Sequence, residues 1–206
     1  MTKFEGRRDA SRDLERIRAL MERATEFSNL SGWSIVISGL LAAAGAGVCR
    51  REGADFDLPL HARTLAVVWG TVFALAAAQG VAFSVANARR KAEPAWSHLT
   101  RQVVVAMLPA LFTGAALTGY AFQTGQLDLL PPCWMLAYGS SLMGLGLFAG
   151  RAFRVAALAF LAFGAASLFF WKDHGLLSML ASFGGIHLVL GAWVLWKPRA
   201  SAGSTP

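Results

Sequence analysis

Six long stretches without Asp, Glu, Lys or Arg take up most of this 206-residue sequence. A helix needs about 18 or more apolar residues to cross roughly 30 Å of hydrocarbon, and five of the six stretches are long enough. The sequence therefore predicts an all-α, polytopic integral membrane protein. The stretches cover residues 27–49, 64–88, 102–127, 129–150, 155–171 and 175–196.

The composition excludes other classes of protein. The chain is 55% hydrophobic and only 15% charged, which is too apolar for a soluble domain of this length. Its net charge is +7, but the basic residues lie between the apolar stretches rather than on one polar surface with base-reading groups. We therefore expect the lipid bilayer as the surrounding medium and no nucleic acid partner.

We expect three regions along the chain. Residues 1–28 are predicted to form a cytoplasmic amphipathic helix, residues 29–197 a domain of six transmembrane helices, and residues 198–206 a disordered cytoplasmic tail. The six spans are predicted at about 30–49, 64–87, 102–123, 131–150, 154–171 and 176–196.

The Lys and Arg residues predict the orientation of the chain. Cytoplasmic segments keep the positive excess. The two terminal segments and the second and fourth connections hold fifteen Lys and Arg residues, against four in the other connections. Both termini are therefore expected in the cytoplasm.

The segment before the first span has helical periodicity. Apolar side chains recur at intervals of three and four residues from about Ala10 to Phe27, and charged side chains occupy the remaining face. Acidic and basic charges nearly cancel, whereas a helix that binds anionic lipid is rich in Lys and Arg. We therefore favour a protein contact over flat lipid binding. Its partner would be the chain's own loops, a second copy in a homo-oligomer or a cytoplasmic protein, contacted through Leu14, Ile17 and Met21.

Two further features allow more than one interpretation. Small residues recur at four-residue spacing, as at Gly39, Ala43 and Gly47, and let helix backbones approach in lipid. They favour either packing within one bundle or an interface between copies. The first outer loop, residues 50–63, is either a solvated connection or a polar lid over a cavity.

His187 is the one ionisable side chain near the middle of a predicted span. Burying such a group in hydrocarbon is costly without a partner, so it marks a hypothetical functional site. One interpretation is a hydrogen bond to a neighbouring span, for which Thr113, Thr118, Ser140, Ser141, Gln79 and Ser38 offer groups. The other is a ligand contact in a cavity, with His187, Pro109, Thr113, Ser141 and Gln79 as the candidate ligand-binding residues.

We expect no cofactor and no metal. A bis-histidine haem needs two axial ligands, but His61, His98 and His174 map near the membrane surfaces. No fixed spacing of ligands resembles a metal site. Cys49 and Cys133 map to the same outer surface, which allows either a disulfide or two separately buried thiols.

Two parts of the sequence carry a resemblance. The first is Glu15-Arg16-Ile17-Arg18 through Leu20-Met21-Glu22-Arg23, with Phe27 and Leu30-Ser31-Gly32; the second is Phe183-Gly184-Gly185-Ile186-His187 with Gly191. They resemble a group of uncharacterised bacterial membrane proteins with several spans, for which no activity is established. The resemblance implies a multi-pass protein of a bacterial inner membrane, and it draws attention to His187 without giving it a role.

The chemistry of the sequence favours a protein that is not an enzyme. It contains no Ser-His-Asp arrangement, Walker loop or HExxH motif, and the spans hold no Asp or Glu. The leading hypothesis is a non-enzymatic sensing or scaffolding module, with no catalytic residue. The alternative is a carrier or binding protein for a small apolar or neutral solute, in an intramembrane cavity around His187.

Overall fold

The computed structural model of the protein describes residues 31–57 and 59–196, and this part of the chain is helical without a β-strand. The predicted all-α class is confirmed for these residues. The expected N-terminal helix, with Leu14, Ile17 and Met21, and the expected tail lie outside them.

Five long helices and a composite last span follow the apolar stretches. The long helices are α2 (Gly32–Arg51), α3 (Ala62–Arg90), α4 (His98–Thr124), α5 (Leu130–Ala149) and α6 (Arg151–Phe170). The last span, Gly175–Trp196, consists of α7 (Gly175–Met179), the π-helical segment η4 (Leu180–Ile186) and α8 (His187–Trp196). Short 3-10 turns precede three of these helices: η1 (Pro59–His61), η2 (Leu127–Leu129) and η3 (Lys172–His174).

Within residues 31–57 and 59–196, five helical segments are long and apolar enough to cross a membrane. They are α2, η1 with α3, α4, α6 and the last span. Helix α5, the predicted fourth span, is not among them; it has 20 residues and includes two prolines, two serines and three glycines. The count of six spans therefore stays a prediction.

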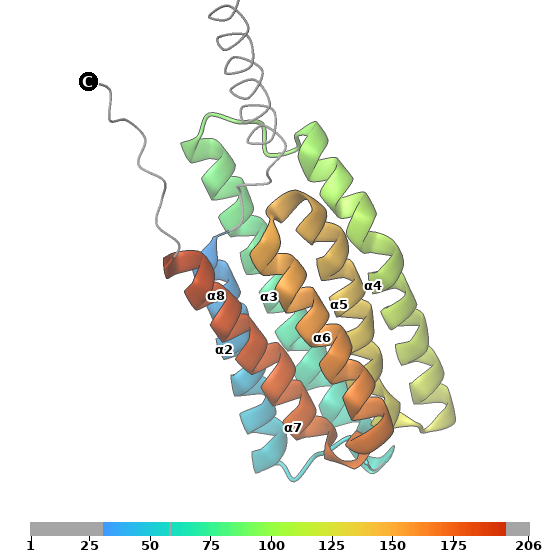
Figure 1. Ribbon diagram of the computed structural model, residues 1–206. Coiled ribbons are helices and arrows are strands. Elements are labelled where there is room, and N and C mark those ends of the chain that lie inside the picture. Colours follow the sequence, from blue (N-terminus) through green and yellow to red (C-terminus); the bar gives the residue numbers. More distant parts are fainter. Residues whose placement is uncertain (1–30, 58, 197–206) are drawn as a thin grey trace, which may run out of the picture.

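Helices that follow one another in the sequence run in opposite directions (Figure 1). One end of the bundle holds the start of α2, the end of α8 and the α3–α4 and α5–α6 connections, and we call it the terminal end. The opposite end holds the other three connections. The two ends of the described chain thus lie at the same end of the bundle, because six helical segments run alternately up and down it.

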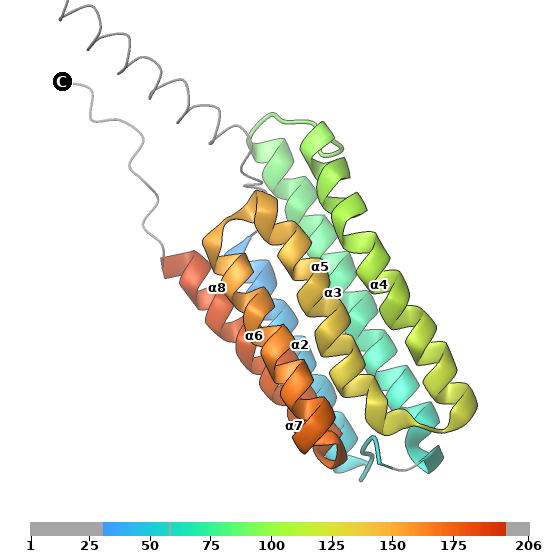
Figure 2. The same ribbon diagram turned by 45° about the vertical axis from the view of Figure 1, so that its right-hand side comes forward.

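Helices α2 and α5 lie inside the bundle, and α3 and α4 lie at its edge (Figure 2). Helix α2 packs along α3 and the last span, and α5 packs between α4 and α6. Only 6% of the most apolar window of α3 and 11% of that of α4 are buried, against 33% to 44% for α2, α6 and the last span. Large apolar side chains are exposed on both edge helices, which is compatible with a membrane-embedded protein.

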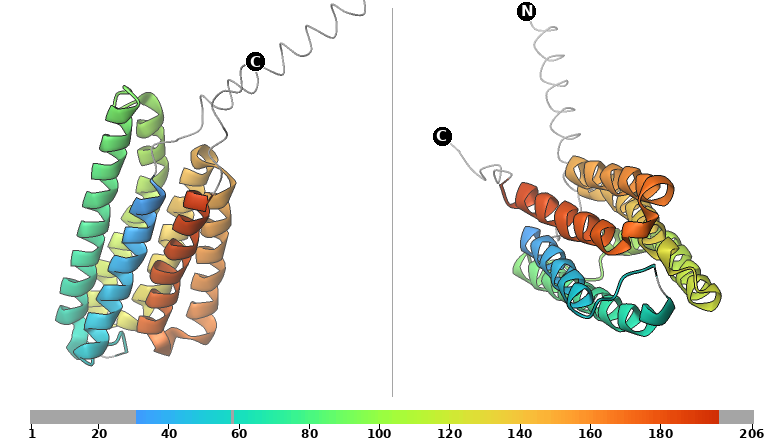
Figure 3. Two further views of the ribbon diagram at one scale, coloured as in Figure 1. Left: turned by 90° about the vertical axis from the view of Figure 1, so that its left-hand side faces the viewer. Right: turned by 90° about the horizontal axis from the view of Figure 1, so that it is seen from below.

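Glycines bring α2 and the last span into close contact, and the two lie side by side in Figure 3. A Cβ atom at Gly191 would lie 2.9 Å from the backbone nitrogen of Val36, and one at Gly39 would lie 3.0 Å from the carbonyl oxygen of Gly184. Close approach gains dispersion energy where no hydrophobic effect drives helix association. Gly39 therefore serves packing within the bundle, whereas a Cβ at Gly47 would meet nothing within 4 Å.

The loop between α2 and α3 closes the opposite end of the bundle. Ala54 and Phe56 are buried in it. The Oδ1 atom of Asp55 accepts hydrogen bonds from the backbone N–H groups of Phe56 at 2.7 Å and Leu176 at 2.9 Å. The second bond caps the first turn of the last span, where a carboxylate also interacts favourably with the helix dipole. The loop thus connects α2 to the last span through a hydrogen bond. The sequence had suggested either a solvated connection or a polar lid, and neither includes this contact.

A single residue separates α5 from α6. Gly150 adopts a φ of +90°, in the region that favours glycine, and reverses the chain between the two helices. The two helices form a tight antiparallel hairpin, and Arg151 and Arg154 both lie in the first turn of α6.

Candidate functional site

A hydrogen bond joins His187, the first residue of α8, to Tyr138 in the middle of α5. The Tyr138 hydroxyl lies 2.8 Å from Nε2 of His187, and His187 is only 7% exposed. The direction of the bond depends on which ring nitrogen carries the proton. Tyr138 was not among the partners that the sequence suggested, although a hydroxyl in the middle of a predicted span was a signal for it.

Two phenylalanine rings enclose this pair. The ring centroids of Phe160 and Phe183 lie 5.0 Å and 5.3 Å from that of Tyr138, and that of Phe160 lies 5.5 Å from that of His187. Phe160 is completely buried. Such an apolar surrounding strengthens the hydrogen bond and raises the cost of losing either partner.

The backbone before His187 is a π-helical segment, Leu180–Ile186, that contains Gly184 and Gly185. A π-helical turn holds more residues than an α-helical turn and often occurs at functional sites. Gly39 of α2 packs against this region, since a Cβ there would lie 3.2 Å from the Cβ of His187. Helix α2 therefore lies close behind the His187 backbone, while the imidazole contacts α5 and α6.

The second imidazole nitrogen of His187, Nδ1, is buried and forms no hydrogen bond with the described part of the chain. The carbonyl group of Phe183, one turn earlier, lies near it but outside hydrogen-bonding geometry. A buried polar atom without a partner costs about 1–3 kcal/mol.

Two of the other candidate ligand-binding residues hold pairs of helices together. Gln79 of α3 donates from Nε2 to the Ser38 hydroxyl at 2.8 Å and accepts from the Ser34 hydroxyl at 2.9 Å, which ties α3 to α2. Ser141 of α5 is completely buried and donates to the carbonyl oxygen of Met107 in α4 at 3.0 Å. Both polar side chains are engaged in contacts between helices.

The last two candidates, Pro109 and Thr113, lie exposed on α4. The Thr113 hydroxyl donates to the Pro109 carbonyl oxygen at 3.0 Å, one turn earlier in the same helix. The structure therefore does not bring the five candidates together around one cavity. The carrier hypothesis was based on such a cavity, and it now rests on His187 alone.

Both cysteines are free thiols in the structure. Cys49 is completely buried in a cluster that includes Leu65 and Leu127. Cys133 is partly exposed in the first turn of α5. The two thiols thus occupy separate packing environments.

These features describe a helical bundle with five segments suited to a membrane and a buried polar pair enclosed by aromatic rings. No family model, curated protein or solved structure matches the chain.

Proposed function

We propose that the protein is a non-enzymatic scaffolding or sensing module of a bacterial inner membrane, with six spans and both termini in the cytoplasm. In this proposal the helical bundle is a rigid platform, and the N-terminal segment contacts the partner. The observation that supports it most is that polar side chains inside the bundle form hydrogen bonds to neighbouring helices.

These polar contacts occur along the whole bundle. The Trp134 indole N–H donates to the Thr118 hydroxyl at 2.8 Å, which joins α5 to α4. The Ser167 hydroxyl donates to that of Ser178 at 3.2 Å, which joins α6 to α7. The contact of Ser141 described above is a second bond between α5 and α4, and those of Gln79 and Tyr138 join two further pairs of helices.

Paired contacts of this kind favour a platform over a transporter. Hydrogen bonds between helices in lipid hold one arrangement, because a separated polar group finds no water there. A carrier works by rocking one part of its bundle against the other around a central site. The polar side chains of this bundle hold the helices in one arrangement, which is the property that a platform needs.

The test of this proposal is the size of the assembly. Replacing Ile17 and Met21 with Glu would put charges on the apolar face of the N-terminal segment, and we expect the assembly to dissociate while membrane insertion is kept. Native mass spectrometry measures the mass of the assembly. Resistance of the membrane fraction to carbonate extraction shows that the chain is inserted. The matched control replaces Arg12 and Glu22 of the polar face with Gln. An assembly of unchanged mass in the Ile17→Glu, Met21→Glu variant would contradict the proposal.

One observation favours a second candidate function, the binding of a small neutral solute with a hydrogen-bonding group at His187. It is the buried Nδ1 atom without a hydrogen-bond partner in the described residues. A non-protein mass that the wild-type chain retains and the His187→Leu variant loses would support this candidate.

A further inference from the structure

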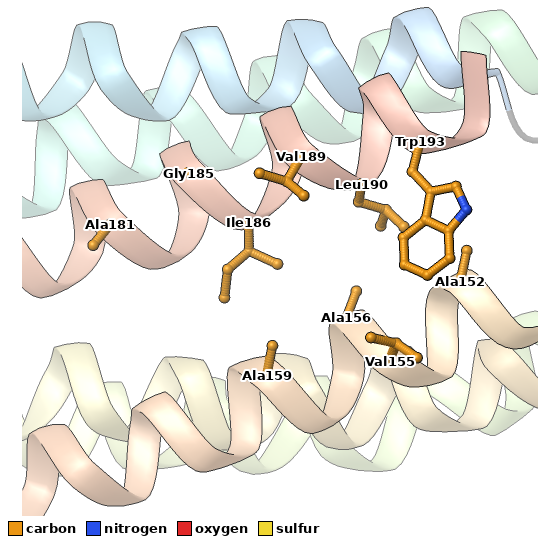
Figure 4. A pocket seen from close by; sticks show the side chains of 10 residues that line it. All are labelled: Ala152, Val155, Ala156, Ala159, Ala181, Gly185, Ile186, Val189, Leu190 and Trp193. Atoms are coloured by element: carbon orange, nitrogen blue, oxygen red, sulfur yellow. The ribbon is translucent and has the colours of Figure 1, made fainter. Parts of the chain in front are cut away.

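An apolar groove runs along the surface of the bundle between α6 and the last span (Figure 4). Its volume is about 300 Å³. Ala152 and Ala159 of α6 form one wall, and Ala181, Gly185 and Trp193 form the other. Ala159, Ala181 and Trp193 are exposed, so the groove is open to the surroundings of the bundle.

The length of the groove corresponds to one leaflet of a bilayer. It begins at the terminal end, where Ala152 is the second residue of α6 and Trp193 lies near the end of α8. From Trp193 to Ala181 it follows the last span for about 18 Å, at 1.5 Å per helical residue. Half of a hydrocarbon core of roughly 30 Å is about 15 Å. The groove is therefore long enough for an acyl chain that extends through one leaflet.

The mouth of the groove carries positive charge and a hydrogen-bond donor. Arg151 is exposed and lies one turn before Val155, a lining residue on the same face of α6. The first turn of α6 contains no acidic residue. The indole of Trp193 lies at the same end (Figure 4), and tryptophan suits the headgroup layer. An arginine and an indole N–H above an apolar groove match a phosphodiester above an acyl chain.

We propose that this groove binds one anionic phospholipid from the cytoplasmic leaflet, with an acyl chain along Ala152 and Ala159 and the phosphate group beside Arg151. The proposal rests on the membrane placement proposed above and is independent of the N-terminal segment. The bound lipid joins α6 to the last span at the end where Trp193 and Arg151 face the cytoplasmic surface.

Native mass spectrometry of the full chain, released from nanodiscs of equal parts phosphatidylglycerol and phosphatidylcholine, tests the site. We expect wild-type protein to retain phosphatidylglycerol in preference to phosphatidylcholine. Ala159→Phe fills the groove and should lower retention of both lipids several-fold. Arg151→Gln should keep the acyl chain but reduce the preference for phosphatidylglycerol about fivefold, the effect of about 1 kcal/mol per basic residue.

Two matched variants control for general effects of the substitutions. Ala115→Phe adds the same side chain to an exposed position of the edge helix α4, and Arg89→Gln removes an exposed charge at the same end of the bundle. Both should retain lipid as the wild type does. The lipid site would be overturned if Ala159→Phe retained as much lipid as the wild type and Arg151→Gln kept the wild-type preference for phosphatidylglycerol. An equal loss of lipid in the two control variants would overturn it as well. A chain that failed to enter nanodiscs would overturn the membrane placement, and the lipid site with it.

Discussion

The Tyr138 hydroxyl and Nε2 of His187 lie 2.8 Å apart and join two helices whose residues are 49 positions apart in the sequence. The rings of Phe160 and Phe183 pack against the pair, so that its surroundings are largely apolar. The stability of the contact between α5 and the last span should therefore depend on this bond.

Removing the hydroxyl in Tyr138→Phe should lower the free energy of unfolding by about 1 kcal/mol, because Nε2 of His187 loses its partner. The measurement is unfolding of the purified chain by sodium dodecyl sulfate in mild detergent. Tyr120→Phe is the matched control, since Tyr120 is 54% exposed on α4. An equal effect of both substitutions would show that the bond between Tyr138 and His187 adds no stability.

Alanine at Gly191 should destabilise the bundle by about 1–3 kcal/mol, because the added Cβ would lie 2.9 Å from the Val36 backbone nitrogen, an atom that cannot move alone. Gly47→Ala in α2 should be neutral or stabilising by up to about 1 kcal/mol, since alanine is the better helix former and space is open there. The same unfolding experiment compares them. A stable Gly191→Ala variant would contradict the close contact between α2 and the last span.

Replacing Asp55 with Ala should cost about 0.5–2 kcal/mol, because the backbone N–H of Leu176 loses its cap. Asp55→Asn keeps an acceptor oxygen and should recover part of the loss. Asp57 is exposed in the same loop, and Asp57→Ala controls for the change in charge. Equal stability of the Asp55→Ala and Asp57→Ala variants would exclude the cap.

The two thiols should differ in reactivity. Cys49 is 0% exposed, whereas Cys133 is partly exposed at the start of α5. In mild detergent we expect a maleimide to label the Cys49→Ser variant, which keeps Cys133, faster than the Cys133→Ser variant. Denaturation should remove the difference. Equal labelling rates in the folded state would contradict the burial of Cys49.

The sequence predicted most of the helices because a long uncharged apolar stretch has few alternatives to a helix. Pro131 and Pro132 lie in the first turn of α5, close to the predicted start of the fourth span, where a missing N–H costs nothing. Hydropathy carries no information about which helices become neighbours. Pro109 and Thr113 therefore looked like cavity residues, although α4 lies at the edge of the bundle and exposes both.

The contacts around the site were harder to predict. Asp55 caps a helix 121 residues further along the chain. This contact forms only because the α2–α3 loop and the start of the last span lie at the same end of the bundle. The π-helical segment before His187 covers seven residues, too few for its period to appear in the sequence. His187 follows this segment directly, and its Nε2 atom lies 2.8 Å from the Tyr138 hydroxyl.

Native mass spectrometry of the full chain from nanodiscs tests most directly whether the protein is a scaffold or a solute-binding protein. We predict an assembly whose mass falls to that of one chain in the Ile17→Glu, Met21→Glu variant, with no bound mass that depends on His187. A single chain that carries a non-lipid mass, lost in His187→Leu, would contradict the scaffold and identify the protein as a solute-binding one.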